Sequence, residues 1–314
     1  MKALVLLALL SGVAMAQEAP PAPIQDWSNV ETVVVTAPKH GPALWHIALN
    51  GADVWILGVV TPMPRGLNWD SAAVGDIVAG ANKVYLQPQL TAGIVETTWF
   101  LLTGLHKLKL QDGQTLLGAL PPDLRARYAA WLVKLGKDAD TDSEYLAAIA
   151  ALDLEGMFRK SAGLEEEADR RVAKIADEAR VPAAPVAVYQ AMPIADEIGS
   201  LSAENENACM KDALDDIDVQ AIHADAAARA WAVGDLAGVK ANYSEARLYD
   251  CFAQTKAFAD VKDRAAADSL NAVHEALATP GKSLIVVSMG ALLRKDGLLD
   301  RLKAQNITVE GPPE

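Results

Sequence analysis

The stretch Trp55-Ile-Leu-Gly-Val-Val-Thr-Pro-Met-Pro64 is typical of a buried strand that ends in a sharp turn. Apolar residues lead into Gly58, and a Thr-Pro-x-Pro sequence then takes the chain away from the strand direction. The pattern predicts that Gly58 forms the turn and that Val59, Val60 and Thr61 lie at the rim of a sheet. Sheet proteins position their chemistry at strand ends of this kind, so this stretch marks the first candidate site.

A hairpin is predicted around the start of this strand. Two apolar runs, residues 42–49 and 52–57, flank Asn50-Gly51, the strongest short signal for a tight hairpin turn. Short apolar runs predict further strands at residues 83–86, 185–189, 284–288 and 307–310. Met289-Gly-Ala291 is predicted to be the turn after the strand at 284–288. Apolar periodicity and capping residues predict helices at residues 69–82, 121–179, 203–278 and 297–304. We therefore expect a mixed α/β (α+β) fold with an N-terminal hairpin, a mixed β-sheet core and a large helical middle region.

The N-terminus has the features of a secretory signal peptide. Met1-Lys2 supplies a positive charge, residues 3–16 are nearly all apolar, and Ala14-Met15-Ala16 is a small-x-small cleavage site. The apolar run is shorter than the roughly 20 residues of a membrane span, although an uncleaved anchor is the alternative. The processed protein is expected to be periplasmic or secreted and to have no membrane span. The predicted divisions are a signal peptide (1–16), a Pro-rich, β-prone arm (17–41) and one domain (42–314).

The charge balance argues against one class of partner. The chain has 41 acidic and 28 basic residues, which give a formal net charge of −13. An acidic surface repels the phosphate backbone of nucleic acids and the headgroups of anionic membranes. We therefore expect no nucleic-acid partner.

Cys209 and Cys251 are the only cysteines of the chain. An even number of cysteines in an oxidising compartment favours a single disulfide, whereas two reduced core cysteines are the alternative. The bridge would close a loop of about 43 residues and stabilise the fold by about 4 kcal/mol at most on the chain-entropy model. Two cysteines alone cannot form a structural zinc site.

The arm contains a β-prone stretch, Glu31-Thr-Val-Val-Val-Thr-Ala37. It resembles a TonB box, the short motif through which outer-membrane transporters pair with the energy-transducing protein TonB by strand addition. A TonB-type contact through Glu31 to Ala37 is therefore one partner hypothesis. The simpler interpretation is an N-terminal edge strand or a flexible arm.

Beyond the arm, several short motifs occur in the order and spacing of a known family. They are Pro42-Ala-Leu-Trp45, Leu57-Gly58, Trp69-Asp-Ser71, Asp263-Arg264 and Asp296-Gly-Leu-Leu299. No single motif is specific, but together they make residues 42–314 resemble the TraB/GumN family, whose animal relatives are the Tiki proteases. The resemblance implies a divalent metal in the active members, which histidines and acids hold and which activates water.

The positions that would hold this metal are altered here. The family's two Gly-x-x-His motifs map onto Gly58-Val-Val-Thr61 and Ser288-Met-Gly-Ala291, so a threonine and an alanine replace the histidines. The family's two glutamates map onto Gln87 and Gln190. A metal site of this type needs neutral imidazoles and a carboxylate, and an amide cannot act as a general base near neutral pH. The resemblance thus implies a divergent member with no catalytic residues, no metal ligands and no cofactor.

Other catalytic and metal-binding patterns are incomplete. None of the five histidines follows a strand at a glycine turn, and His46 is expected to be a satisfied side chain on a sheet face. Residues 286–290 lack the leading glycine of a nucleophile elbow, and no histidine follows Ser288. A cluster without the spacing of a calcium loop is predicted to be a solvated helix face: Asp212, Asp215, Asp216 and Asp218.

The leading hypothesis is an exported TraB/GumN-like pseudoenzyme that keeps the hydrolase fold and cleft as a peptide-binding, small-molecule-binding or regulatory protein. Amides and a guanidinium are donors suited to a peptide or carboxylate ligand. One alternative is an active metal-dependent peptide hydrolase with a rebuilt site for Mn, Co or Zn. Another is an accessory of outer-membrane uptake or polysaccharide export. The degenerate cleft is expected to comprise Gly58, Thr61, Gln87, Gln190, Arg264, Gly290 and Ala291.

Overall fold

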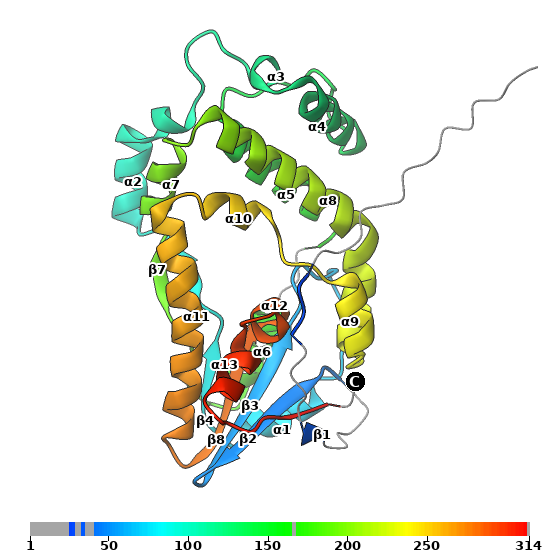
Figure 1. The fold of residues 1–314 in the computed structure, drawn as a ribbon, viewed down its shortest axis with the longest axis vertical. Coiled ribbons are helices and arrows are strands. Elements are labelled where there is room, and N and C mark those ends of the chain that lie inside the picture. Colours follow the sequence, from blue (N-terminus) through cyan, green and yellow to red (C-terminus); the bar gives the residue numbers. More distant parts are fainter. Residues whose placement is uncertain (1–24, 29–32, 35–40, 165–167, 313–314) are drawn as a thin grey trace, which may run out of the picture.

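Strand β3 (Ala52–Val59) is the central strand of a seven-stranded mixed sheet among the residues that the structure, a computed structural model, describes (Figure 1). These residues are 25–28, 33–34, 41–164 and 168–312. In order across the sheet, the strands are β1 (Val33–Val34), β9 (Glu310–Gly311), β2 (Leu44–Leu49), β3, β8 (Gly281–Ser288), β4 (Ala81–Leu86) and β6 (Ala183–Pro185). Because β3, β8, β4 and β6 are parallel, their carboxyl ends lie at one edge of the sheet.

The predicted hairpin is confirmed. All six residues of β2 pair antiparallel with residues 52–57 of β3, and Asn50 and Gly51 have φ angles of 52° and 83° in the turn between them. Asparagine and glycine tolerate this left-handed conformation best, so the local sequence specifies the turn. The prediction that Gly58 forms a turn is wrong. Gly58 lies inside β3, and the strand continues to Val59.

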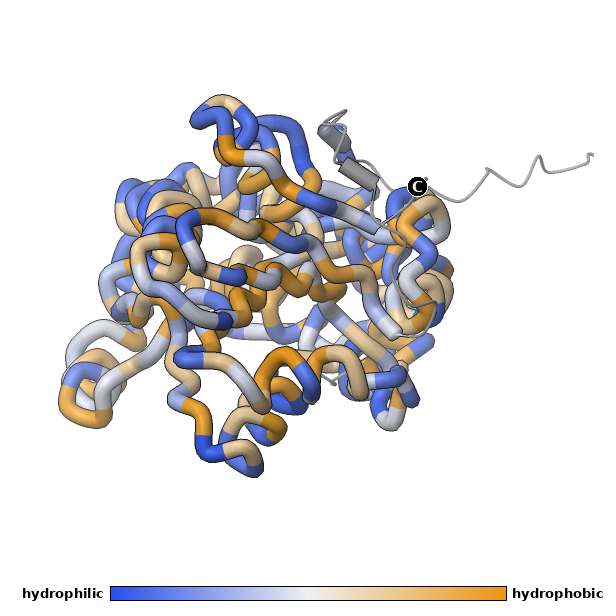
Figure 2. Tube along the Cα trace, turned by 90° about the horizontal axis from the view of Figure 1, so that it is seen from below, coloured by the Kyte–Doolittle hydropathy of each residue, from blue (hydrophilic) through white to orange (hydrophobic). Residues whose placement is uncertain are grey.

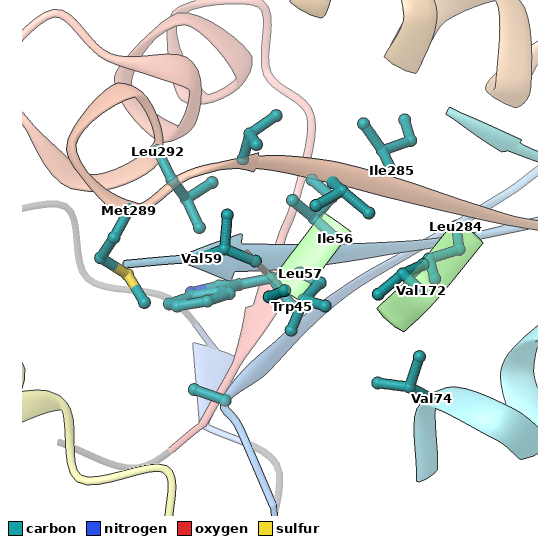
Figure 3. Packing of buried hydrophobic residues seen from close by; sticks show 14 of the residues in the cluster. Trp45, Ile56, Leu57, Val59, Val74, Val172, Leu284, Ile285, Met289 and Leu292 are labelled. Carbon is teal, nitrogen blue, oxygen red and sulfur yellow. The ribbon is translucent and has the colours of Figure 1, made fainter. Parts of the chain in front are cut away.

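The main core surrounds β3 and β8, whose strands are buried on both sides. Figure 3 shows Ile56, Leu57 and Leu284 of the sheet packed near apolar side chains of the surrounding helices. The helices that supply those side chains are α1 (Ala72–Ala79), α6 (Ala168–Glu178) and α12 (Met289–Leu293). Figure 2 shows apolar segments running through the interior, which is the arrangement that hydrophobic burial favours.

A helical layer with its own core lies beside the sheet. The disulfide between Cys209 and Cys251 joins α8 to α10 in this layer, as predicted. No helix of the described residues is both long and apolar enough to cross a membrane. The remaining helices are α2 (Ile94–Thr103), the 3-10 helix η1 (Leu105–Leu108), α3 (Leu116–Ala119), α4 (Pro122–Lys134), α5 (Ala147–Ser161), α7 (Met192–Ile198), α8 (Ala203–Ala232), α9 (Leu236–Asn242), α10 (Leu248–Phe252), α11 (Lys256–Leu277) and α13 (Leu298–Ala304).

Three local predictions need correction. The strand predicted at 185–189 is two strands, β6 and β7 (Val188–Gln190), and β7 pairs with β5 (Gln89–Thr91) in a separate two-stranded ladder. The Val186 N–H still donates to the Leu86 carbonyl at 3.0 Å, so β6 ends because its partner β4 ends at Leu86. The strand predicted at 307–310 is shorter and shifted, at β9. The turn predicted at 289–291 begins α12, because the Ser288 hydroxyl accepts a hydrogen bond from the backbone N–H of Ala291.

The prediction of a solvated acidic face at residues 212–218 is wrong for its central member. Asp216 is 4% exposed, and its carboxylate accepts a hydrogen bond from the backbone N–H of Leu248 at 2.9 Å. Burial raises the pKa of Asp216 to about 6. Arg127 donates to the neighbouring Asp215 at 2.8 Å. The cluster therefore connects α8 to α4 and α10 instead of facing solvent.

Only part of the N-terminal arm is described. Val33 and Val34 form β1 at the edge of the sheet and pair in parallel with β9. The rest of Glu31–Ala37 and the predicted signal peptide lie outside the described residues. The TonB-type contact therefore stays a prediction.

His46 of β2 joins three neighbouring strands of the sheet, β9, β2 and β3. Its Nδ1 lies 3.0 Å from a carboxylate oxygen of Glu310, its Nε2 is hydrogen-bonded to Asp53, and its ring stacks on Trp55 at a centroid distance of 4.3 Å. Burial alone would lower the pKa of His46, but the hydrogen bonds and charges of Glu310 and Asp53 outweigh it and raise the pKa. His46 is thus the satisfied sheet-face histidine that the sequence predicts.

This raised pKa predicts a pH-dependent contribution to stability. The contribution is fully present below the unfolded-state pKa of about 6.5 and is lost as pH rises through the folded-state pKa. His46→Gln should therefore lower the free energy of unfolding at about pH 5.5 more than at about pH 8.5, by up to about 1 kcal/mol, because both carboxylates are partly exposed. Urea unfolding at the two pH values measures this difference, and a pH-independent effect would contradict it.

Candidate functional site

A cleft of about 1120 Å³ opens at the carboxyl edge of the parallel strands. Thr61 follows β3, Gln87 follows β4, and Ser288 ends β8; all three line the cleft. Parallel strands bring their carboxyl ends to the same edge, so residues far apart in the chain meet there. The cleft therefore occupies the place where α/β sheets hold ligands.

The structure brings together three of the four positions onto which the resemblance maps the family's metal ligands. Thr61, Gln87 and Ala291 all line the cleft. The fourth, Gln190, lies with Arg264 in a neighbouring pocket of about 410 Å³. Tyr189 lines both spaces. The two spaces are thus adjacent, and the predicted cleft residues divide between them.

Gly58 and Gly290 are structural residues beside the cleft. A Cβ atom on Gly58 would lie 2.9 Å from Leu292 Cδ2 and 3.0 Å from Met289 Sδ, so glycine allows α12 to pack against β3. A Cβ atom on Gly290 would lie 2.1 Å from Glu245 Cδ. Real side chains do not approach so closely. Gly290 therefore leaves space for the Glu245 side chain.

Gln87 is already hydrogen-bonded across the cleft wall. Its Nε2 donates to Asp169 Oδ1 at 2.9 Å, and its backbone N–H points to Asp169 Oδ2 at 3.4 Å. Asp169 belongs to α6, so this contact joins the end of β4 to a helix. The amide thus acts as a hydrogen-bond donor to a carboxylate, a role that a glutamate could not fill at neutral pH.

Glu245 is a second carboxylate of the cleft. The Ser288 hydroxyl donates to Glu245 Oε1 at 3.2 Å, and Arg294 Nη1 lies 3.4 Å from Glu245 Oε2. Sequence reasoning missed both Glu245 and Asp169, because neither residue follows a strand or belongs to a motif. Only the three-dimensional arrangement places them in the cleft.

The cleft is more basic than the rest of the chain. Five acidic side chains line it, against seven basic ones, although the whole chain has a net charge of −13. Some of these charges pair with each other, such as Lys262 with Asp250 at 2.5 Å. An excess of positive charge in a concave site favours anionic ligands. The basic side chains are Arg159, Arg170, Arg247, Lys262, Arg294, Lys295 and Arg301.

Tyr189 connects the cleft to the neighbouring pocket. Its hydroxyl donates to Asp268 Oδ2 at 2.6 Å, and the Arg264 guanidinium lies over its ring at 5.1 Å from the centroid. Burial and the bond to Asp268 raise the pKa of Tyr189, so the phenol stays protonated near neutral pH. Tyr189 therefore lies between the two spaces, with its hydroxyl bonded to Asp268 and its ring covered by Arg264.

The residues of the cleft do not fit the divalent metal that the resemblance implies for active members. No histidine or cysteine is among the described residues that line it, and its two central carboxylates are bonded to Gln87, Ser288 and Arg294. Within the described part of the chain, no three His, Cys, Asp or Glu side chains group closely enough to hold a metal ion. Threonine and glutamine are weak neutral ligands, and alanine is none.

Comparison with known proteins agrees with this fold. The model of the TraB/PrgY/gumN family matches residues 43–311, which is most of the chain. No curated protein and no solved structure gives a significant match. The matched range includes the strands of the main sheet except β1, the helical layer and most of the cleft lining, and it begins one residue after the predicted domain boundary. The chain belongs to the TraB/PrgY/gumN family.

Proposed function

We propose that this protein is an exported, ligand-binding member of its family that does not hydrolyse peptides by metal catalysis. The observation on which the proposal rests is the combination of a large cleft with Thr61, Gln87 and Ala291 at the inherited ligand positions. A cleft of about 1120 Å³ is large enough for a ligand of several residues. The side chains that remain in it suit binding better than metal-dependent hydrolysis.

Export is supported by two features. The N-terminal sequence has the charge, apolar run and cleavage site of a signal peptide. The bonded pair Cys209–Cys251 is compatible with an oxidising compartment such as the periplasm or the extracellular space. We therefore assign the protein to the periplasm or the secreted fraction as part of the same proposal.

The ligand class follows from the donors in the cleft. Lys295 and Arg301 bring positive charge to the wall near α13. Arg301 Nε donates to the backbone carbonyl of Asp296 at 2.9 Å, and this neutral acceptor does not cancel the charge of the guanidinium. Guanidinium and ammonium groups recognise carboxylates, and aromatic rings such as Tyr243 and Phe258 offer apolar contact area. A peptide or another carboxylate-bearing molecule satisfies both requirements.

A second candidate is a hydrolase with a rebuilt site. Asp169 and Glu245 are the observation that favours it, because each places a carboxylate in the cleft. Both carboxylates accept hydrogen bonds from neighbouring side chains, which reduces their capacity to bind a cation. Metal titration separates the two candidates.

Calorimetric titration of the purified protein with Mn, Co and Zn should give no stoichiometric binding, with a dissociation constant weaker than roughly 1 mM. The combined variant Thr61→His, Gln87→Glu and Ala291→His should gain micromolar binding, because it supplies two imidazoles and a carboxylate at positions that line one cleft. Stoichiometric tight binding by the unaltered protein would overturn the proposal.

The matched control introduces the same residue types on exposed sites outside the cleft. Thr279→His, Gln111→Glu and Ala162→His are suitable because all three positions are exposed and lie in separate turns or loops. This control variant should bind metal no better than the unaltered protein. Equal gains in both variants would show that the added histidines bind metal without help from the cleft.

A further inference from the structure

The N-terminal segment Gln25–Ser28 lies at the mouth of the cleft in a strand-like conformation. Trp27 forms an antiparallel bridge with Arg294, beside which the Ser28 N–H donates to the Leu293 carbonyl at 2.7 Å. The Lys295 N–H donates to the Asp26 carbonyl at 2.9 Å. Gln25 and Asp26 are themselves part of the cleft lining. The backbone of this segment is thus bound as an added strand is bound.

Three side chains of the same segment make specific contacts with the domain. The Trp27 indole donates to the Lys240 carbonyl at 3.1 Å, and its ring lies 6.3 Å from that of Tyr243 between centroids. The Ser28 hydroxyl is hydrogen-bonded to Asp300. The Gln25 amide oxygen accepts from the Glu245 N–H at 3.3 Å. Gln25 and Trp27 therefore contact Glu245 and Tyr243 of the cleft lining, whereas Ser28 contacts Asp300 of α13 beside the cleft.

We propose that the cleft binds extended peptides by strand-like pairing with Leu293–Lys295, and that residues 25–28 occupy this position as an internal ligand. The inference rests on the proposed function and specifies its ligand class. Main-chain pairing provides affinity for any extended peptide. Selectivity comes from two side-chain contacts, that of an indole with Tyr243 and that of a hydroxyl with Asp300. The preferred peptide has an aromatic residue followed by a small hydroxyl residue.

The tether makes this internal ligand a competitor. A segment joined to the domain by a short connection rebinds at millimolar effective concentration, so a free peptide must displace it. Occupancy by residues 25–28 therefore reduces the affinity for peptides of the same kind. A change that weakens the segment without altering the cleft should increase that affinity.

The test uses a fluorescently labelled peptide with the sequence of residues 24–30 and the full chain as Trp27→Ala. Anisotropy titration should show binding at least ten-fold tighter to Trp27→Ala than to the unaltered protein, because the internal competitor has lost its indole contacts. Ser28→Pro serves as a second variant, since it removes the N–H that bonds Leu293 while it keeps Trp27. A scrambled peptide and a peptide with alanine in place of its tryptophan are the controls.

Equal affinity for the labelled peptide in the unaltered protein and in both variants would overturn the inference and leave the segment as a structural strap. The metal titration of the proposed function is independent of that outcome. A protein that binds neither peptide nor metal therefore contradicts the peptide assignment alone, whereas tight metal binding contradicts the proposed function itself.

A different feature, the apolar face of α2, supports a second inference. Figure 1 shows α2 at the edge of the molecule beside α7. Its large apolar side chains are mostly exposed, with Ile94 at 86%, Val95 at 77%, Trp99 at 68% and Leu102 at 76%. No described residue buries this face, although Phe100 on the opposite side packs against the helical core. The exposed set, with Leu101, amounts to on the order of 700 Å², close to the roughly 800 Å² per partner of a standard interface.

The geometry points to a second copy of this chain as the occupant of the α2 face, in a two-fold antiparallel arrangement. Val95, Trp99 and Leu102 have the i, i+4, i+7 spacing of a helix-packing seam. Glu96 is the only charged residue of α2. Antiparallel packing would bring Glu96 of one copy to the end of α2 of the other copy, next to the exposed His106 of η1. A bilayer fits less well, because α2 has no lysine or arginine and the chain is acidic.

Sedimentation of the purified protein should show a dimer at micromolar concentration, and Trp99→Glu should raise the dissociation constant at least a hundred-fold. Val133→Glu is the matched control, because Val133 is a 56% exposed apolar residue on α4, and it should leave the dimer intact. A monomeric unaltered protein, or a dimer that survives Trp99→Glu, would overturn the inference. Flotation of a monomeric protein with vesicles of mixed zwitterionic and anionic lipids, abolished by Trp99→Glu, would assign the face to a membrane surface instead.

Discussion

The hydrogen bond from the Trp231 indole to the Gly58 carbonyl connects the parts of this structure. Trp231 Nε1 lies 2.6 Å from the carbonyl oxygen of Gly58, and the contact is buried. It joins α8, the longest helix of the helical layer, to the central strand of the sheet. Leaving the buried indole N–H without a partner would destabilise the fold by about 1–3 kcal/mol. The bond therefore fixes the position of α8 relative to β3. Gly58 also admits α12 on its other side, and the cleft begins three residues further on, at Thr61.

The helix that Trp231 anchors also fixes one wall of the cleft. Asp216 of α8 accepts from the Leu248 N–H, and Arg247 lies 3.5 Å from Asp215. These bonds hold the segment that contains Glu245 next to Ser288. The disulfide between α8 and α10 restrains the same region from the far side. The shape of the cleft therefore depends on the helical layer, although the residues at the strand ends come from the sheet.

The predictable parts of the fold are those with a local physical cause. Asn50-Gly51 specifies its own turn, and parallel strands bring Thr61 and Gln87 to one edge whatever the helices do. The α2 helix could not be predicted, because apolar residues on nearly all its sides remove the amphipathic pattern that marks a surface helix. The strand at 185–189 divides because its partner changes from β4, which ends at Leu86, to β5, which begins at Gln89.

The site was predictable only where the chain order matches a motif. Asp169 and Glu245 enter the cleft from α6 and from the segment after α9, and no local signal in the sequence marks either residue. Asp216 has the spacing of a surface residue, yet the segment that begins α10 covers it. Gly58 has the sequence context of a turn residue, whereas glycine is needed there because Met289 and Leu292 approach the backbone closely. In each case the deciding neighbour is distant in sequence.

The residues at the positions where the resemblance implies metal ligands also affect how the walls of the cleft are held together. The resemblance implies that histidines and acids at these strand ends would hold a metal ion in active relatives. Here direct bonds connect the same walls: Gln87 to Asp169 joins β4 to α6, and Ser288 to Glu245 joins β8 to the segment after α9. Each bond needs a hydrogen-bond donor facing a carboxylate, which glutamine and serine provide and an ionised glutamate would not. A glutamate at position 87 would place a second carboxylate beside Asp169, and the two like charges would repel each other, so this contact between β4 and α6 depends on the amide.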